Sequence, residues 1–289
     1  MKKTNTLVSV IMNCYNGEKY LLESIQSVLD QTYKNWELIF WDNKSKDNSK
    51  KLFRSIKDTR LKYYCSRINC SLYKARNLAI KKCKGEFIAF IDVDDKWFKN
   101  KLEVQIKKFK NKKIGLVYSN LYLLNDKKKT IKIFSRKKLP EGDITSKLLR
   151  NYSLSILTTV IRKNLLKKFK LNFDKKYKII GDFDLFVKLT KKTKVSCSQE
   201  PLAYYRLHDN NLSKKLNNTW VNELYYWVKQ NQKLFDKKDI TYLKQYIHYL
   251  KVKNIILRKN IYKSFISIFN FPIRIYKIKL LFFLIKNIY

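Results

Sequence analysis

The stretch Gly85-Glu-Phe-Ile-Ala-Phe-Ile-Asp-Val-Asp-Asp95 is a short apolar run that ends in the carboxylates Asp92, Asp94 and Asp95. Its centre, residues 87–91, is too short for a helix and rich in aromatic and β-branched residues, so it predicts a buried strand. Clustered acids at the end of such a strand are electrostatically costly unless a cation or polar ligand lies there. Carboxylate oxygens suit Mg²⁺ or Mn²⁺, which in turn hold phosphate groups. A solvated acidic loop could have the same sequence, so this stretch alone leaves both interpretations open.

Apolar runs that predict strands alternate with helical patterns along the first third of the chain. Strands are predicted at residues 7–12, 36–41, 61–64 and 87–91. Helices are predicted between them, at about residues 21–29, 47–56 and 73–82. Turn-forming and polar clusters follow the first two strands, at residues 13–17 and 42–45. This alternation is typical of a doubly wound α/β sheet, whose ligands bind beyond the carboxyl ends of the strands.

The second half of the chain adds further strands and one helix. Strands are predicted at residues 115–119, 121–124, 131–134 and 155–161, with a hairpin turn at residues 125–129. Residues 181–189 predict a helix that has Asp182 at its start. The sequence contains neither GxGxxG nor GxxxxGK[ST], so neither the dinucleotide fingerprint nor the P-loop is present. Any phosphate groups of a ligand must therefore be held in another way, and a metal ion bound by the carboxylate cluster is the candidate.

Five blocks of the sequence resemble glycosyltransferase family 2, in the order and spacing of that family. They are residues 9–17, 27–33, 41–49, 75–77 and 85–95. The resemblance extends from Thr6 to about Ser213. It implies the GT-A fold, an α/β domain with a mixed, mainly parallel sheet and flanking helices. It also implies an enzyme that uses a divalent metal, Mg²⁺ or Mn²⁺, to transfer sugars from nucleotide diphosphates.

The resemblance assigns donor-binding roles to residues near the ends of the first two strands. Tyr15 would lie against the nucleobase, with Asn16 beside it in the nucleotide-sugar site, and Asp42 would accept a hydrogen bond from the base. Arg76 would stand near the diphosphate. The flat ring of Tyr15, the carboxylate of Asp42, which only accepts hydrogen bonds, and the permanently charged guanidinium of Arg76 suit these tasks. From the residues alone, a core aromatic at Tyr15 and a solvated helix face at Arg76 remain alternatives.

The same resemblance extends to the metal. Asp92-Val-Asp94 matches the DxD motif, and alternation along an extended strand end points both carboxylates the same way. Asp94 is assigned to the metal, Asp92 to the ribose or to groups around the metal, and Asp95 to a supporting role. The block at residues 204–213 resembles the family's YRxH segment. It implies that Arg206 and His208 close over the diphosphate, with an imidazole nitrogen of His208 near the metal.

Asp182 is the candidate general base. Family members usually carry Glu-Asp at this point, and the acid in the Asp182 position deprotonates the acceptor hydroxyl. Gly181 stands here in place of the Glu, which leaves Asp182 but removes a neighbouring charge. An Asp at a helix start is often only an N-terminal cap, so that interpretation also stays open.

Composition limits the class of protein and its compartment. At 289 residues with 45% hydrophobic residues the chain can bury one large core. Its five cysteines include no CxxC pair, which favours a reducing compartment, and no signal peptide is predicted. We therefore expect a cytoplasmic protein.

The net charge of +41 would attract nucleic acid or anionic lipid, but the lysines are spread over the whole chain. A solvated basic surface is the better interpretation, and nucleic acid is not an expected partner.

Domain boundaries follow from the resemblance and the helical pattern. We expect a catalytic domain at residues 1–215, with a nucleotide-sugar half at about 1–115 and an acceptor half at about 116–215. Residues 216–289 predict a basic, aromatic-rich helical extension. Its longest unbroken apolar run, residues 280–285, is too short to span a bilayer. Attachment to an anionic membrane surface, packing on the catalytic domain and a dimer contact all remain open for its end, residues 264–289.

The sequence thus predicts a metal-dependent inverting glycosyltransferase. It would move a sugar from a nucleotide-diphosphate donor, with a UDP-sugar expected, to a hydroxyl of a glycan or lipid-linked acceptor in surface polysaccharide synthesis. Its expected place is the cytoplasm or the inner face of the cytoplasmic membrane. The alternative is a degenerate transferase scaffold that binds RNA or anionic surfaces without catalysis. Asn43, Lys44 and Gly181 depart from the family pattern and keep that alternative open, whereas the acids argue for the enzyme.

Overall fold

The computed structural model describes residues 6–212, 217–257, 261–269, 271 and 274–288. The chain forms two compact units, which divide between Asn211 and Leu212. This division lies a few residues before the domain boundary expected from the sequence. Each unit is described by itself.

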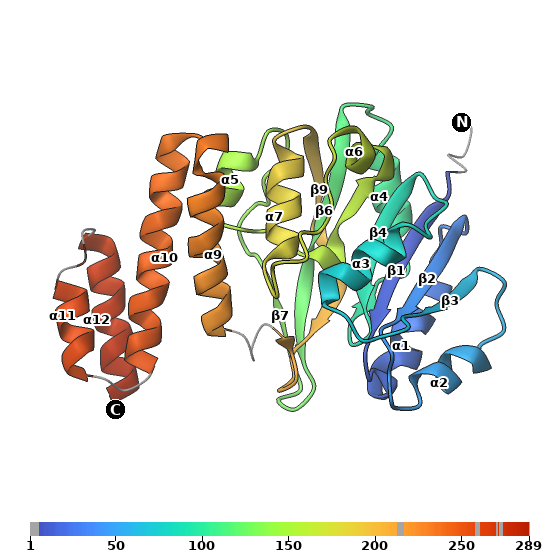
Figure 1. Cartoon of the computed structure of the whole chain (residues 1–289), viewed down its shortest axis with the longest axis horizontal. Helices are drawn as coiled ribbons and strands as arrows, with labels where there is room; N and C mark the ends of the chain where they lie inside the picture. Colours follow the sequence, from blue (N-terminus) through green and yellow to red (C-terminus); the bar gives the residue numbers. More distant parts are fainter. Residues whose placement is uncertain (1–5, 213–216, 258–260, 270, 272–273, 289) are drawn as a thin grey trace. The chain divides into compact units, whose positions relative to one another are not determined.

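The first unit is built on a nine-stranded sheet with the order β3-β2-β1-β4-β8-β6-β9-β5, to which β7 adds beside β6. Its first half consists of four parallel strands (Figure 1). They are β1 (Val8–Cys14), β2 (Trp36–Asp42), β3 (Leu61–Cys65) and β4 (Phe87–Asp92). These strands confirm the four that the apolar runs predict. Cys14 pairs with Asp42 and Asn13 with Asp92, so the carboxyl ends of β1, β2 and β4 lie level with one another.

The second half of the sheet mixes parallel and antiparallel pairs. Its strands are β5 (Lys96–Trp97), β6 (Ile114–Asn125), β7 (Thr130–Ile133), β8 (Val160–Arg162) and β9 (Lys194–Arg206). β8 is antiparallel to β4 and β6, whereas β9 is parallel to β6. The two strands predicted on either side of Asn120 form one strand, β6, whose register shifts at that residue. The mixed, mainly parallel α/β sheet expected from the sequence is confirmed.

The strand predicted at residues 155–161 is mostly wrong. A 3₁₀ turn occupies Ile156–Thr158, and β8 begins only at Val160. The hydroxyls of Thr158 and Thr159 both donate to the carbonyl oxygen of Ser155, at 3.1 and 2.8 Å. Such local bonds offer the backbone a turn in place of a ladder. Apolar, β-branched composition therefore overstated the length of this strand.

Helices cover both faces of the sheet. They are α1 (Glu18–Leu29), α2 (Ser49–Ser55), α3 (Leu72–Ile80), α4 (Lys101–Lys108), α5 (Thr145–Arg150), α6 (Lys163–Lys168) and α7 (Gly181–Thr190). Alternate residues of β1, such as Val10 and Met12, join a core that includes Ile25 of α1 and Ile106 of α4. On the other face, nearest the viewer in Figure 1, Phe90 of β4 meets Phe186 of α7.

Gly85 allows β4 to enter the sheet close to β1. A Cβ atom at this position would lie 2.6 Å from the carbonyl oxygen of Leu7 and 2.6 Å from the backbone nitrogen of Ser9. No side chain fits that gap, so glycine is required by the close approach of two backbones. The start of the acid-bearing strand is thereby fixed against β1.

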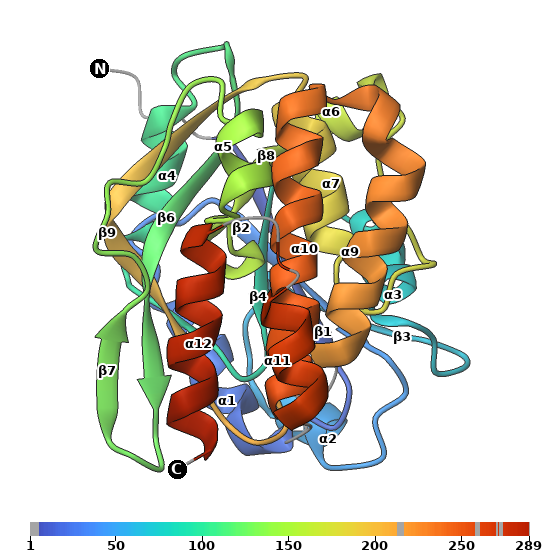
Figure 2. The same cartoon turned by 90° about the vertical axis from the view of Figure 1, so that its left-hand side faces the viewer.

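The second unit is helical over the part of it that the structure describes, as the sequence predicts. Its helices are α9 (Asn217–Asn231), the 3₁₀ turn Gln232–Leu234, α10 (Lys237–Leu257), α11 (Ile261–Phe269) and α12 (Arg274–Ile288). Figure 2 shows α11 and α12 running alongside α10. A small apolar core joins Val252 of α10, Ile268 of α11 and Leu280 of α12. His248 packs its ring against Phe271, 4.6 Å between centroids. Among the described helices none is long and apolar enough to cross a membrane.

Candidate active site

The loops that follow β1 and β2 are tied together and leave Tyr15 open to solvent. Asn16 has a positive φ of 54°, its backbone N–H donates to Ser45 Oγ at 3.0 Å, and its Oδ1 accepts from the N–H of Lys46 at 2.9 Å. The Tyr15 side chain is 52% exposed. Asn16 therefore shapes the site through these bonds, and the ring of Tyr15 is available to a flat ligand.

Asp42 is a buried acceptor at the end of β2. Its Oδ1 accepts from the N–H of Ser45 at 2.7 Å, and its Oδ2 accepts from the hydroxyl of Tyr63 at 2.6 Å. Burial and, after it, the bond to Asp42 raise the pKa of Tyr63, so this phenol keeps its proton. A carboxylate has about four acceptor positions, so each oxygen retains capacity for one further donor. Asp42 thus orders the loop and can still accept from a base.

Two departures from the family pattern, Asn43 and Lys44, are part of this loop structure. Asn43 Oδ1 accepts from the N–H of Cys70 at 3.1 Å, and its Nδ2 donates to the oxygen of Cys70 at 2.6 Å. Lys44 adopts a positive φ of 65°, which few residues other than glycine and asparagine take readily. Both residues are accommodated by local backbone geometry and leave Asp42 in place.

Arg76 of α3 contacts the first acid of the DxD motif, Asp92. Its Nη2 donates to Asp92 Oδ1 at 2.9 Å and to Oδ2 at 3.3 Å. The guanidinium is buried against the rings of Tyr73 and Phe173, 5.6 and 5.7 Å from their centroids. Burial by itself lowers the pKa of Arg76, but Asp92, Tyr73 and Asp182 together raise it above its usual value. A fixed positive charge therefore lies against Asp92, and the expected role of Arg76 near the diphosphate stays a prediction.

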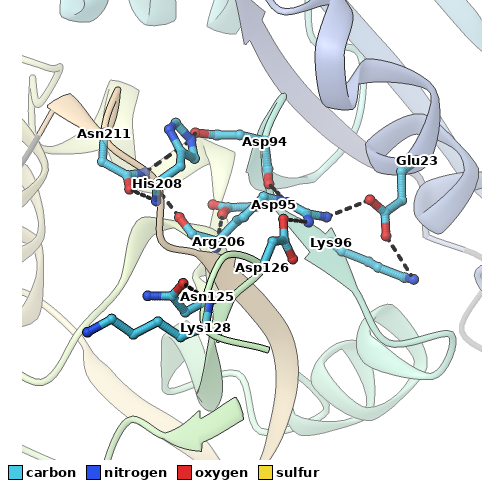
Figure 3. Close-up of polar contacts among 10 residues, drawn as sticks. All are labelled: Glu23, Asp94, Asp95, Lys96, Asn125, Asp126, Lys128, Arg206, His208 and Asn211. Atoms are coloured by element: carbon cyan, nitrogen blue, oxygen red, sulfur yellow. Dashed lines mark hydrogen bonds and ion pairs between the residues drawn. The ribbon is translucent and has the colours of Figure 1, made fainter. Parts of the chain in front are cut away.

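Asp94 and His208 face each other across the site (Figure 3). His208 Nε2 lies 2.8 Å from Asp94 Oδ2. The N–H of Asn210 donates to His208 Nδ1 at 3.2 Å, so in the neutral ring Nε2 carries the proton and donates to Asp94. Burial, and then the nearby Asp92, raise the pKa of Asp94, while the bond from His208 opposes that rise. The two residues assigned to the metal are thus brought together.

Arg206 holds the turn that carries these acids. Its Nε donates to the carbonyl oxygen of Asp94 at 2.9 Å, and its backbone N–H donates to Asp95 Oδ1 at 2.9 Å. Its two terminal nitrogens pair with Asp126 and with Glu23, the latter at 2.5 Å (Figure 3). The whole guanidinium is therefore engaged and buried. In the described structure Arg206 acts on the site through the DxD backbone, and its expected place over the diphosphate stays a prediction.

Asp95 has a buried oxygen that needs a partner. Its side chain is 2% exposed, and Oδ2 accepts no hydrogen bond from any described residue. Burial, followed by repulsion from Asp94 and Asp92, raises the pKa of Asp95 well above its usual range. An unpaired buried carboxyl oxygen beside two more acids is a feature that a bound cation would relieve.

The side chains at this point suit a hard divalent cation that is held by few protein ligands. In the described part of the chain, no group of three or more His, Cys, Asp or Glu side chains is arranged around one metal position. Mg²⁺ commonly takes one or two carboxylates and completes its coordination with water and substrate phosphates. The Asp94–His208 pair is consistent with such a sparse set.

Asp182 lies at the start of α7, on the same edge as Arg76 and Asp92. Its Oδ1 is 3.4 Å from the hydroxyl of Tyr73, which also donates to the carbonyl oxygen of Ile179 at 2.6 Å. Burial raises the pKa of Asp182, and Arg76 opposes that rise. The carboxylate is therefore a stronger base than a solvated Asp, with a nearby cation that helps to keep it ionised.

Gly181 is explained by the ring of Tyr73. A Cβ atom on Gly181 would lie 2.6 Å from Tyr73 Cδ2 and Cε2. The Glu usual in the family is thus excluded by an aromatic ring that packs against the backbone and lies next to the candidate base. The neighbouring acid Asp184 is buried and ion-paired with Lys188 at 2.5 Å, so it does not share this position.

Sequence reasoning missed the residues that support the site from a distance. Glu23 and Asp126 bind Arg206, and Asn211 accepts from the N–H of His208 at 2.6 Å and donates to the oxygen of Arg206 at 3.1 Å. Asn211 falls in the block that resembles the family's YRxH segment, and its position there was the available signal. Glu23 and Asp126 have no such signal, because each is a charged residue on an ordinary surface element.

The fold is the GT-A fold expected from the sequence. S. aureus TarS, residues 1–349 in complex with UDP, superposes with a TM-score of 0.59 at 18% identity, over 95% of this chain and 69% of that one. The mannosyltransferase PcManGT from Pyrobaculum calidifontis, in complex with GDP-Man and Mn²⁺, gives a TM-score of 0.59 at 16% identity, over 83% and 69%. At these identities the likeness shows the fold.

Sequence comparison gives the family. The profile of Glycosyl transferase family 2 matches residues 9–182. The Escherichia coli protein WfgD, a UDP-Glc:alpha-D-GlcNAc-diphosphoundecaprenol beta-1,3-glucosyltransferase, is 34% identical over 221 residues, which are 74% of this chain and 84% of WfgD. The chain belongs to glycosyltransferase family 2. This confirms the enzyme interpretation, a glycosyltransferase, over a non-enzymatic basic binder.

Proposed function

We propose that the protein is a metal-dependent, inverting glycosyltransferase that uses a nucleotide-diphosphate sugar, a UDP-sugar in the first instance. Its acceptor would be a hydroxyl of a glycan or lipid-linked sugar used to build a surface polysaccharide. WfgD, with its UDP-Glc donor and diphosphoundecaprenol-linked acceptor, supports this choice, as does the UDP complex of TarS. The observation that carries the proposal is the meeting of Arg76–Asp92, Asp94–His208 and Asp182 at one edge of the sheet.

The donor would lie along the carboxyl ends of β1, β2 and β4. The exposed ring of Tyr15 would stack on the nucleobase, and Asp42 would use its remaining acceptor capacity toward a base N–H. Asn16 keeps the two loops together. Asp92, held by Arg76 and partly exposed, would face the ribose.

A divalent metal, Mg²⁺ or Mn²⁺, would be held by Asp94 and His208, with Asp95 beneath them. When bound, it supplies positive charge that stabilises the diphosphate as it leaves. His208 would then coordinate through Nε2 as the Nδ1–H tautomer, so the proton that Nε2 now donates to Asp94 would be exchanged for one on Nδ1, which replaces the bond accepted there from the N–H of Asn210. Arg206 keeps the turn in position during binding and release.

Asp182 would act as the general base. It would take the proton of the acceptor hydroxyl as that oxygen forms a bond to the anomeric carbon. The bond between the anomeric carbon and the phosphate oxygen breaks on the opposite side, and the nucleoside diphosphate leaves with the electron pair. One displacement of this kind inverts the configuration at the anomeric carbon. Arg76 interacts electrostatically with both Asp92 and Asp182, so its charge would help to stabilise the base and the leaving group.

We also propose that residues 1–215 act as the catalytic domain, with a donor half up to about residue 115, and residues 216–289 as its basic extension. The enzyme would work at the inner face of the cytoplasmic membrane, where a lipid-linked acceptor is found. A basic extension would help to concentrate the enzyme there, since an anionic leaflet attracts clustered lysines.

A ligand-binding screen tests the proposal. Melting temperature is measured with each of the UDP-, GDP-, dTDP- and ADP-sugars, with Mn²⁺ and with chelator. A ligand at 100 times its Kd adds about 2.7 kcal/mol to the free energy of unfolding by mass action. We expect a UDP-sugar to raise the melting temperature in the presence of Mn²⁺, and slow release of UDP without an acceptor. Equal effects with chelator would contradict the metal assignment, and a shift with another nucleotide alone would contradict the donor.

A further inference from the structure

The last helix of the second unit, α12, has two apolar sides. One set of its side chains is buried against the unit's own core: Tyr276, Leu280 and Leu284. A second set is exposed: Ile278, Leu281, Phe282 and Ile285. At about 100° per residue these sets are centred on roughly opposite sides of the helix. A surface helix normally has one apolar face, toward its core, and a polar face toward water. The second apolar side of α12 is not accounted for by the packing of its own unit.

Helix α11 extends this exposed surface. Ser264 and Ile268 are buried, while Phe265, Ile266 and Phe269 are exposed, Phe269 to 80%. Lys277 Nζ of α12 lies 5.6 Å from the centroid of the Phe269 ring, so the exposed side of α11 adjoins that of α12. We use the name α11–α12 face for the exposed apolar residues Phe265, Ile266, Phe269, Ile278, Leu281, Phe282 and Ile285.

Positive charge borders the α11–α12 face. By helical position, Lys277 lies at one edge of the exposed side of α12, and Lys279 and Lys286 lie at the other. The sequence contains no Asp or Glu from residue 240 to residue 289. A second copy of the chain would bring the same lysines toward one another, which like-charge repulsion opposes. An anionic partner complements both the charge and the apolar centre.

We propose that the α11–α12 face docks on an anionic lipid surface, with Phe269 and Phe282 in the boundary between headgroups and acyl chains. Interfacial helices bury their apolar side by about 5–10 Å and place lysines among the headgroups. No described helix can span a bilayer, which is consistent with attachment at the surface. This docking surface specifies the membrane location that forms part of the proposed function.

Point variants of the whole chain test the docking surface. Truncation before α11 would uncover Val252 and Ile256, which belong to the unit's core, so exposed side chains are the better targets. Phe269→Ser/Phe282→Ser removes two exposed rings. Burial of one such ring changes a partition constant by roughly tenfold or more, so we expect binding to vesicles of phosphatidylglycerol and phosphatidylcholine to fall by about 10²-fold. Phe269→Trp/Phe282→Trp keeps large interfacial rings and should bind like the wild type.

Matched controls separate this face from the rest of the basic surface. Ile131→Ser/Phe134→Ser removes two exposed apolar side chains from the first unit and should leave vesicle binding unchanged. Lys279→Glu/Lys286→Glu should weaken binding to anionic vesicles and reduce its sensitivity to salt. Lys110→Glu/Lys112→Glu makes the same change of charge at exposed positions of the first unit and should have a much smaller effect.

Three results would overturn the docking proposal. The first is a wild-type chain that does not sediment with anionic vesicles. The second is an equal loss of binding in the Lys110/Lys112 and Lys279/Lys286 variants, which would assign binding to the whole basic surface. The third is self-association by light scattering that Phe269→Ser/Phe282→Ser abolishes while vesicle binding stays unchanged. Hydrolysis of nucleotide sugar without vesicles is measured in parallel. If the wild type shows no hydrolysis while its vesicle binding is as expected, the proposed function is refuted and the docking proposal is retained.

Discussion

Gly181→Ala should destabilise the protein, although alanine is the better helix former. Gly181 is the first residue of α7, and a Cβ there would lie 2.6–2.7 Å from three atoms of the Tyr73 ring. The ring has little room to withdraw, because it is buried, stacks on Phe173 with centroids 5.6 Å apart and donates its hydroxyl to Ile179. The added methyl group must therefore displace either the ring or the start of α7.

The magnitude follows from two opposing effects. Helix propensity alone favours alanine over glycine by up to about 1 kcal/mol. Overpacking a filled site costs about 1–3 kcal/mol, so we expect a net loss of about 1–2 kcal/mol in the free energy of unfolding. For a chain of this size that is a fall in melting temperature of about 2–4 °C per kcal/mol. Turnover should fall by roughly tenfold or more, because the displaced Tyr73 hydroxyl lies 3.4 Å from Asp182.

Thermal unfolding and steady-state transfer measure these effects, and a double-mutant cycle with Tyr73→Leu tests their cause. If the clash is the cause, the loss from Gly181→Ala should be smaller in the Tyr73→Leu background than in the wild type. Gly142→Ala is the control, since a Cβ there meets nothing within 4 Å and only the φ of +84° is unfavourable. It should lose about 1–2 kcal/mol of stability without loss of turnover. A Gly181→Ala protein as stable as the wild type, or strictly additive losses in the cycle, would refute the packing argument.

Three further substitutions probe the site. Asp94→Asn should abolish metal-dependent donor binding, because the amide keeps the shape but loses the anionic oxygen; normal activity under stringent chelation would contradict this. Asp182→Asn should leave nucleotide binding nearly intact and lower transfer by about 10²-fold or more. Because burial raises the pKa of Asp182, the wild-type rate should fall on the acid side at a pH above the usual Asp range, and this limb should be absent from the variant's residual rate. Arg206→Lys should weaken the Mn²⁺-dependent rise in melting temperature, because one ammonium group cannot replace the contacts of the guanidinium to Asp94, Asp126 and Glu23. The control is Arg60→Lys, which lies far from the DxD motif in the sheet and should leave this rise unchanged.

The fold was largely predictable because its central strands are buried on both sides. Strands such as β1 and β4 are therefore mostly apolar on both faces, which leaves a clear run in the sequence. The helix predicted with Asp182 at its start was also correct, since Asp182 lies in the first turn of α7 and an acid before an apolar helical pattern marks a helix start. The strand prediction for residues 155–161 was wrong because local hydrogen bonds replace strand pairing there. Their threonines form local bonds to Ser155, and composition does not distinguish these from a ladder.

The motifs pointed to residues that the structure brings together, but not to the contacts that these residues make. Arg206 was found through the YRxH block, yet its partners Glu23, Asp94 and Asp126 lie between 80 and 183 positions away in the chain. Contacts over such separations leave no local pattern in the sequence. The way in which Arg206 holds the DxD turn could therefore not be deduced. Gly181 likewise looked like the loss of a charge, whereas its cause is the ring of Tyr73, more than 100 residues earlier.

The charge balance of the site argues for the metal independently of the motif. Arg76 is committed to Asp92, and the ring of His208 donates to Asp94. Arg206 is committed to acids on two other elements, Glu23 and Asp126. These three groups are therefore occupied by acids before any substrate arrives. A nucleotide diphosphate adds further negative charge, and its departure as a leaving group concentrates that charge on the phosphate oxygens. Because Asp95 already holds a buried oxygen without a partner in the described structure, an added cation would satisfy both the protein and the ligand.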